Sequence, residues 1–230
     1  MDALLTLLLG PEMSASMRIW SALAPALLIS ALFILGFVVF LVRSALLGVP
    51  EDPETTKRGG SMLVSSLLRH FFFWLIRPLW ALLARSEIPP TAITTLSVLL
   101  GIGSGFAAAA GRFALAGWLF IFSGILDALD GRLARLRNQV TTWGAAIDST
   151  LDRLADMAVL MGLAWYYRNS WVLLMCLLSM TGSSLVPYIR ARGEGLGVVI
   201  KDGLMQRVER VVYLGAGVAL CAPGCLRPVP

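Results

Sequence analysis

Long apolar segments separated by short polar ones constrain this chain more than any other feature. Hydrophobic residues make up 57% of the 230 residues and charged residues only 14%, against roughly a quarter charged in soluble domains. A helix of about 20 apolar residues crosses a bilayer. Candidate spans are Ile19–Val42, Thr91–Gly111, Phe113–Asp130, Trp143–Tyr167, Trp171–Ile189 and the shorter Val211–Ala222. We therefore expect an all-α, polytopic transmembrane helical bundle.

The positive charges gather at alternate ends of these spans. The formal net charge is +5, which by itself would fit a nucleic-acid partner. The basic residues near one set of span ends are Arg132, Arg135, Arg137, Arg190, Arg192, Lys201, Arg207 and Arg210. This is the positive-inside pattern, which places those ends in the cytoplasm and near anionic lipid headgroups. We expect a multi-pass cell-membrane protein that binds membrane lipids and no nucleic acid.

Four parts follow one another along the chain. Residues 1–50 form a tail and an extra hydrophobic span, and the polar, Pro- and Gly-containing residues 51–60 form a linker. Residues 61–88 mix basic, aromatic and leucine side chains, which predicts a helix lying in the membrane interface and kinked at Pro78. Residues 89–230 form the main membrane domain.

Five aspartates stand among the apolar segments, within LDALDGRLARLRNQVTTWGAAIDSTLDRLAD, residues 126–156. A carboxylate in hydrocarbon costs at least a few kcal/mol, so it normally lines a protein interior or a watery cavity. Asp127 and Asp130 are three apart, and Asp148 and Asp152 are four apart, so each pair shares one helix face. Two antiparallel helices with these faces opposed bring four carboxylates to one point.

Such a group suits a divalent cation. Oxygen ligands without His or Cys favour magnesium or manganese over zinc, and paired metals often clamp a phosphoryl group. Gly131, Ala134 and Gly144 keep the same faces shallow for a bulky ligand or a neighbouring helix. The alternative is that the aspartates only pair with neighbouring arginines at a solvated helix end. Four acids at helical spacing on consecutive segments favour the metal site.

From Asp127 to Asp152 the chain matches the pattern D-x2-D-G-x2-A-R-x8-G-x3-D-x3-D without a gap. This resembles the signature of the CDP-alcohol phosphatidyltransferase family, and the wider resemblance covers about residues 60–222. It implies six core membrane helices, a polar cavity facing the cytoplasm and a site for two magnesium ions, with manganese as a substitute. It also implies transfer of a phosphatidyl group from CDP-diacylglycerol to a polar alcohol, with release of CMP.

The resemblance assigns roles to individual residues. Asp127, Asp130 and Asp148 are implied metal ligands, and Asp152 is the implied general base, which also touches a metal. The positions that match family contacts to the CDP headgroup are Thr91, Thr94, Gly131, Ala134, Arg135, Thr141 and Gly144. Thr91 stands where the family usually has Asn.

Two later stretches, SSLVPYIRARGEGLG and KDGLMQRVERVVYLGAG, are similar to the phosphatidylinositol-phosphate and archaetidylinositol-phosphate synthase branch of this family. That likeness implies a pocket for a phosphate on the acceptor alcohol, because guanidiniums bind phosphate through paired, charge-assisted hydrogen bonds. The implied pocket residues are Arg153, Arg190, Arg192 and Arg210. Inositol phosphate is therefore the expected acceptor. Gln206 and Val208 replace the usual Glu and Pro. These two departures weaken the case for inositol phosphate relative to glycerol phosphate or another polar alcohol.

Several alternatives stay open. The same chemistry serves glycerol phosphate, serine or inositol, and span-end arginines also serve membrane topology alone. A non-enzymatic transporter or scaffold is the rival from another class, although the chain lacks the related halves typical of many transporters. The 20 residues after Arg210 are long enough for one more span but not for a further one. We therefore expect the last of the six core helices that the resemblance implies to be missing. Homodimerisation also stays open.

Overall fold

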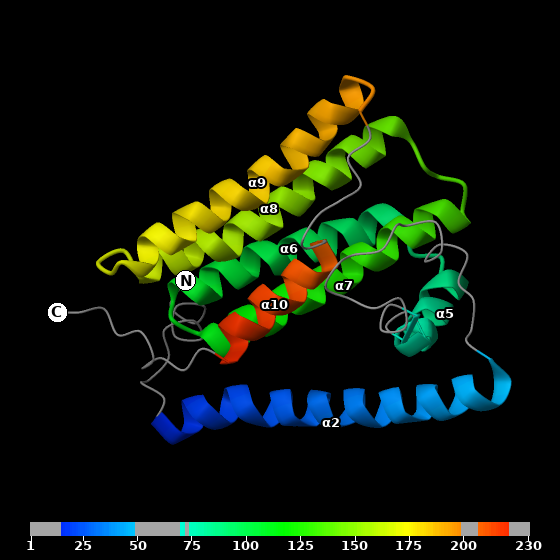
Figure 1. Cartoon of the computed structure of the whole chain (residues 1–230), viewed down its shortest axis with the longest axis horizontal. Coiled ribbons are helices and arrows are strands. Elements are labelled where there is room, and N and C mark those ends of the chain that lie inside the picture. The colour runs from blue at the N-terminus through cyan, green and yellow to red at the C-terminus, as the bar shows by residue number, and fades with distance from the viewer. Residues whose placement is uncertain (1–14, 49–69, 72–73, 199–206, 221–230) are drawn as a thin grey trace.

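A computed structural model describes residues 15–48, 70–71, 74–198 and 207–220. Within these ranges the chain forms seven helices and no strand, which confirms the predicted all-α fold class (Figure 1). The helices are α2 (Ala15–Leu47), α5 (Arg77–Arg85), α6 (Pro90–Ala109), α7 (Phe113–Leu136), α8 (Thr142–Tyr166), α9 (Val172–Gly195) and α10 (Arg207–Leu220). The predicted linker 51–60, Gln206 and residues 221–230 lie outside the described residues.

Three of the described helices, α6, α7 and α9, are long and apolar enough to cross a membrane. Helix α8 has 25 residues, but it carries Asp148, Asp152, Arg153 and Asp156, and it falls outside this group. Shorter apolar helical stretches are Ala31–Leu47 and Arg210–Leu220. Three of the six predicted spans therefore have the length and composition of a membrane helix.

Helix α6 lies between α7 and α8 and packs against both (Figure 1). Glycines set the approach of α6 to α8. A Cβ added to Gly162 would lie 2.0 Å from the carbonyl oxygen of Gly105, and a Cβ added to Gly105 would lie 2.4 Å from that of Ala158. One turn away, a Cβ on Gly101 would lie 2.6 Å from the Cβ of Ala155. Backbones approach this closely only where side chains are absent, so these glycines fix α8 against α6.

Helix α10 packs along α7 in the same way. A Cβ on Gly117 would lie 2.4 Å from the carbonyl oxygen of Gly215 and from the backbone nitrogen of Ala219. Val211, in the first half of α10, is buried in a cluster with Phe120 of α7 and with Val159 and Leu160 of α8. This packing brings the beginning of α10 beside the middle of α8.

The end of α7 holds the segment around α5. Residues 74–75 are helical, a turn at Ile76 precedes α5, and Pro78 lies in the first turn of α5, where the missing N–H costs no hydrogen bond. Arg137, directly after α7, donates to the carbonyl oxygens of Ser86 and, at 2.7 Å, Ile88. These contacts tie the α5–α6 connection to the end of α7.

Aromatic side chains connect α2 to the residues before α5. The rings of Phe33, Phe37 and Phe40 lie 4.8, 5.1 and 5.5 Å from that of Phe71, which is fully buried. Apart from this cluster, α2 exposes many large apolar side chains. Helix α2 is therefore attached to the bundle by its aromatic side, and its other faces are apolar and open.

Candidate functional site

Three carboxylates from two helices meet near the end of α7. Asp127 of α7 and Asp148 and Asp152 of α8 each offer a carboxylate oxygen, and these oxygens all lie within 4.8 Å of one another. All three residues are half-buried. Opposite ligands of one divalent cation are about 4–5 Å apart, since metal–oxygen bonds measure about 2.0–2.6 Å. The three carboxylates thus fit the donor set of a divalent metal.

Asp130, the fourth predicted ligand, lies one turn further along α7 and outside this group of three. It is only 2% exposed, and beside its carboxylate lie the side chain of Thr94 and the backbone N–H of Gly131. The carboxylates of Asp127 and Asp148 lie close enough to act on its charge. A buried carboxylate among other acids is costly unless a cation lies beside it. The burial of Asp130 therefore also fits a metal site.

The local sequence explains how α7 and α8 present these side chains. Helix α7 continues to Leu136, six residues beyond the predicted end at Asp130, and so carries Arg135 as well. Asn138 then takes a left-handed conformation with φ of 52°, which asparagine tolerates better than most residues. Both helices pack more extensively on α6 than on each other. The acidic faces of α7 and α8 consequently lie near each other although the two helices pack little against one another.

The predicted CDP contacts fall at three places around this group. Thr91 and Thr94 lie in the first turn and a half of α6, and the Thr94 hydroxyl donates to the carbonyl oxygen of Pro90 at 3.1 Å. Thr94 also lies beside the carboxylate of Asp130. Thr91 is exposed. The start of α6 thus borders the acidic group through Thr94.

Glycine and alanine occupy the α7 face beside the aspartates. A Cβ on Gly131 would meet only the Nη1 atom of Arg135, at 3.6 Å, so packing within the described chain does not require glycine there. Ala134 is half-buried, and Arg135 is exposed in the last turn of α7. The surface next to Asp130 is shallow, as expected where a bulky headgroup approaches the helix.

Thr141 and Gly144 have a structural role of their own. Thr141 is the N-cap of α8, and its hydroxyl oxygen accepts a hydrogen bond from the backbone N–H of Gly144 at 2.9 Å. A Cβ on Gly144 would lie 2.9 Å from that oxygen. The pair therefore caps the start of the helix that carries Asp148 and Asp152. The sequence predicted only a headgroup contact for these two residues and not this capping role.

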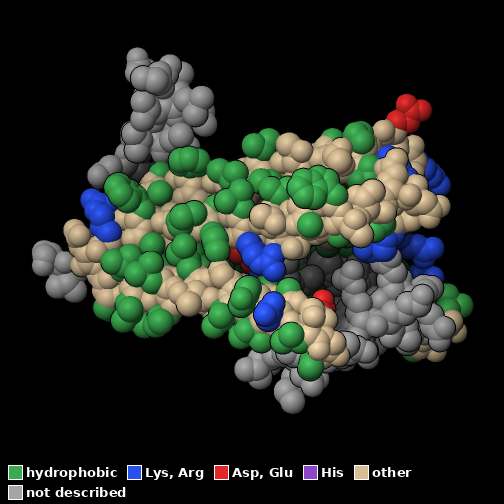
Figure 2. All heavy atoms as spheres, turned by 90° about the horizontal axis from the view of Figure 1, so that it is seen from above, with side chains coloured by type: hydrophobic (Ala, Val, Ile, Leu, Met, Phe, Trp, Pro, Cys, Tyr) green, Lys and Arg blue, Asp and Glu red, His purple; other side chains and the backbone are tan. Residues whose placement is uncertain are grey.

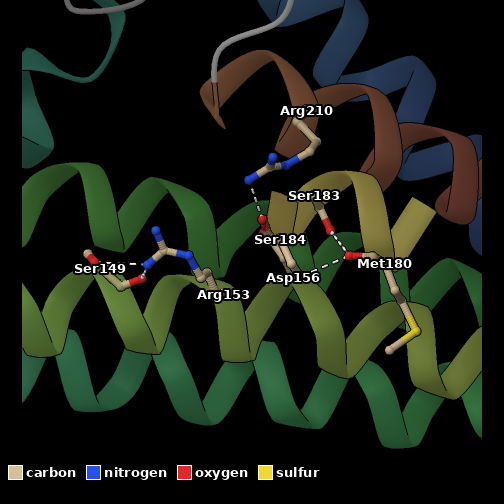
Figure 3. Close-up of polar contacts among 7 residues, drawn as sticks. All are labelled: Ser149, Arg153, Asp156, Met180, Ser183, Ser184 and Arg210. Carbon is tan, nitrogen blue, oxygen red and sulfur yellow. Dashed lines mark hydrogen bonds and ion pairs between the residues drawn. The ribbon is translucent and has the colours of Figure 1, made fainter. Parts of the chain in front are cut away.

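The four predicted acceptor arginines are held differently. Arg190 and Arg192 are exposed near the end of α9. Arg153 folds back on its own helix and donates to the carbonyl oxygen of Ser149 at 2.5 Å and to its hydroxyl at 2.9 Å (Figure 3). Arg210 donates to a carboxylate oxygen of Asp156 at 2.5 Å. Among the four, only Arg210 makes a recorded ion pair with α8.

Sequence reasoning gave no role to Asp156. It is 3% exposed and lies four residues after Asp152 on α8. The spacing of four residues places Asp152 and Asp156 on one helix face and could have indicated a role for Asp156. Its partner could not be predicted in this way, because Arg210 lies 54 residues away on α10. Asp156 therefore links α8 to α10 through Arg210.

Charged side chains gather on one part of the described surface. Figure 2 shows blue Lys and Arg side chains gathered around a hollow, with red carboxylates at its edge, while green apolar side chains cover much of the remaining described surface. A hollow bordered by both acidic and basic groups suits a ligand that carries phosphates, because cations and arginines both interact with phosphate oxygens.

Comparison with known proteins decides the family. Residues 87–229, more than half of the chain, match the CDP-alcohol phosphatidyltransferase family. The chain belongs to this family. The match confirms the resemblance predicted from the aspartate pattern, and it covers α6 to α10, whereas α2 lies outside it.

Curated members of the family include proteins named for inositol phosphate. A phosphatidylinositol phosphate synthase of Mycobacteroides abscessus is 33% identical over 163 residues, which cover 66% of this chain and 71% of the relative. One from Streptomyces avermitilis is 34% identical over 166 residues, 66% of this chain and 65% of the relative. An archaetidylinositol phosphate synthase of Methanothermobacter thermautotrophicus is 35% identical over 133 residues, 58% and 67% respectively.

Proposed function

We propose that this chain transfers a phosphatidyl group from CDP-diacylglycerol to inositol phosphate and releases CMP. The observation that carries the proposal is the acidic group of Asp127, Asp148 and Asp152, which lies within the residues matched to the family. The names of the relatives support the choice of acceptor. Family membership supports the donor and the leaving group.

The aspartates provide the binding site and the base. Two magnesium ions, or manganese in their place, would be held by Asp127, Asp130, Asp148 and Asp152 and, when bound, would neutralise the pyrophosphate. Asp152 accepts the proton of the acceptor hydroxyl, whose oxygen forms a bond to the phosphorus that carries diacylglycerol. The bond from that phosphorus to the CMP oxygen breaks, and CMP leaves.

The shallow face of α7 receives the donor headgroup. Gly131 and Ala134 leave room beside Asp130, and Thr94 and Arg135 border that room from α6 and from the last turn of α7. Holding the reacting groups in line lowers the barrier, because the cost of bringing them together is met on binding. The carboxylates therefore act together with a surface shaped for a bulky nucleotide.

The arginines select the acceptor. Arg210 is partly withdrawn from water, with 25% of its side chain exposed, and a charge-assisted hydrogen bond to phosphate gains strength in such surroundings. Arg153, Arg190 and Arg192 add positive charge from α8 and α9. We propose that these residues bind the phosphate of inositol phosphate and so distinguish it from inositol and serine.

An acceptor screen tests this function. The purified chain receives CDP-diacylglycerol, magnesium and one of four acceptors: inositol phosphate, glycerol phosphate, serine or inositol. We expect CMP release and a phosphatidylinositol phosphate product, identified by mass spectrometry, with inositol phosphate above the other three. No CMP with any acceptor, in magnesium or manganese, would contradict a transferase of this kind. Ion flux through vesicles containing the chain, without CMP release, would support the transporter instead.

A preference for glycerol phosphate would keep the chemistry and change the acceptor. A preference for serine or inositol would contradict the phosphate pocket while leaving the transfer reaction in place.

We also propose that the chain spans the cell membrane several times with the acidic group facing the cytoplasm, because basic residues flank that end of the helices.

A further inference from the structure

Asp156 and Arg210 join α8 to α10 beside the proposed active site. The Nη2 atom of Arg210 lies 2.5 Å from the Oδ2 atom of Asp156, and 54 residues separate the two along the chain. Figure 3 shows the guanidinium of Arg210 reaching from α10 down to the carboxylate on α8. A carboxylate that is only 3% exposed requires such a partner, because an unpaired buried charge is strongly destabilising.

This contact uses only part of the arginine. A guanidinium has five N–H donors in a planar fork, and the recorded bond to Asp156 engages Nη2. The Nε atom is buried and has no hydrogen-bond partner among the described residues. The side chain stays 25% exposed, and of its nitrogens only Nε is both buried and without a partner among the described residues. Arg210 therefore has donors available for an anion while its Nη2 atom donates to Asp156.

The backbone of α10 is already fixed by packing, but a long side chain is not. Val211 is buried against α7 and α8, which sets the position of the first half of α10. The Arg210 side chain still has many accessible rotamers unless a contact restricts it. Asp156 provides that restriction. Because it follows Asp152 by four residues, it places the guanidinium about 6 Å along α8 from the proposed base.

We propose that Asp156 is a positioning residue that orients Arg210 toward the phosphate of the acceptor. The acceptor's reacting hydroxyl then lies at Asp152 while its phosphate meets the remaining donors of Arg210. One helical turn separates the two contact points, a separation that a small phosphorylated polyol spans. The inference rests on the proposed function and extends it to how the chain selects phosphorylated alcohols.

A plain structural strut between α8 and α10 would make the same ion pair, so the test must separate the two roles. The variants are Asp156→Asn, Arg210→Gln and the double variant. Asp156→Asn is nearly the same shape as the original residue, and Arg210→Gln is shorter and uncharged but still offers a neutral hydrogen-bond donor. The Michaelis constants for inositol phosphate and for CDP-diacylglycerol are measured separately, together with the melting temperature. Val211→Ala is the matched control, since it removes buried α10 packing without touching the pair.

A positioning role predicts effects confined to the acceptor. Arg210→Gln should raise the acceptor KM about ten- to hundredfold, as expected for one lost charge-assisted hydrogen bond. Asp156→Asn should raise it by less, and the double variant should be no worse than Arg210→Gln alone, because Asp156 acts through Arg210. The donor KM should stay within about twofold. Val211→Ala should lower the melting temperature without changing the ratio of the two KM values.

Other outcomes are decisive as well. Additive effects in the double variant, or equal changes in both KM values, would show a strut and overturn the positioning role. An unchanged acceptor KM in Asp156→Asn, with a large effect of Arg210→Gln, would overturn the role while leaving the phosphate pocket intact. An unchanged acceptor KM in Arg210→Gln would refute the pocket and the role together. If Asp156→Asn does not fold, Asp156→Glu replaces it: it keeps the charge, displaces the guanidinium and should still raise the acceptor KM.

Discussion

At the scale of single residues, three carboxylates within 4.8 Å of one another create strong mutual repulsion. Two like charges about 4 Å apart repel by roughly 4 kcal/mol at an effective dielectric constant of 20. Asp130, buried beside them, adds a fourth acid. Acids gathered in this way are typical of functional sites, so the arrangement is informative about function.

The repulsion predicts that divalent cations stabilise the fold. Magnesium or manganese should raise the melting temperature of the purified chain, since a ligand that binds only the folded state stabilises it by mass action. Asp148→Asn, which removes one carboxylate of the three, should itself be stable but should reduce the metal-induced increase. Differential scanning fluorimetry with a metal titration measures both. An equal increase in the two proteins would argue against a site at these residues.

The proposed base gives a second prediction at this scale. Asp152→Asn keeps the shape of the side chain but loses the proton acceptor, so CMP release should fall by at least about 100-fold. Binding of CDP-diacylglycerol should be partly retained, because Asp127, Asp130 and Asp148 remain. Thr150→Ala, an exposed change on the same helix, serves as the control and should leave turnover near normal. Turnover near that of the unmodified chain in Asp152→Asn would exclude Asp152 as the base.

At the scale of elements, the contact between α6 and α8 decides where the acidic residues of α8 lie. Gly105 and Gly162 bring the two backbones together, and no bulky side chain lies between them. The acidic half of α8 is the other end of the same rigid helix. A change at the glycine contact therefore tilts or shifts Asp148 and Asp152 relative to Asp127 of α7.

Gly162→Ala should both destabilise the chain and reduce activity. The added Cβ would lie 2.0 Å from the carbonyl oxygen of Gly105, so the helices must separate, at a cost of about 1–3 kcal/mol or more. Gly182→Ala on α9 is the matched control: no atom lies within 4 Å of its added Cβ, and alanine is the better helix former. Thermal unfolding and CMP release report the two effects. Equal behaviour of both variants would contradict a tight α6–α8 contact.

At the scale of the whole molecule, the α7–α8 connection and the α8–α9 turn lie at opposite ends of α8 (Figure 1), and the aspartates of α8 lie in its first half. Arg135 lies in the last turn of α7 and Arg137 directly follows the helix. The aromatic cluster around Phe71 attaches α2 outside the part matched to the family. If the long apolar helices cross the bilayer, the two ends of α8 face opposite sides of the membrane.

Cysteine labelling tests this orientation. Asn138→Cys and Asn169→Cys, made separately in a chain whose native cysteines are replaced by serine, mark the exposed turns before and after α8. In intact cells a membrane-impermeant maleimide should label the variant at 169, and it should label the one at 138 only after permeabilisation, because the positive-inside pattern places that end in the cytoplasm. Labelling of both positions from the same side would contradict the predicted crossing by α8.

Local patterns determined much of this molecule from the sequence. The apolar segments predicted helices because a chain in lipid must satisfy its backbone hydrogen bonds within each segment. The spacing of Asp127 and Asp130, and of Asp148 and Asp152, placed each pair on one helix face, since 3.6 residues per turn relate neighbours along one helix. The same spacing supported the family resemblance that the comparison confirmed.

Contacts between distant segments were decided only by the tertiary structure. The approach of α8 to α6 depends on glycines 57 positions apart, Gly105 and Gly162, and the partner of Asp156 lies 54 residues further along, on α10. Periodicity within a helix describes which residues share a face, but it contains no information on which other helix meets that face. That choice is made by close packing, because only one arrangement fits all the small residues and buried charges together.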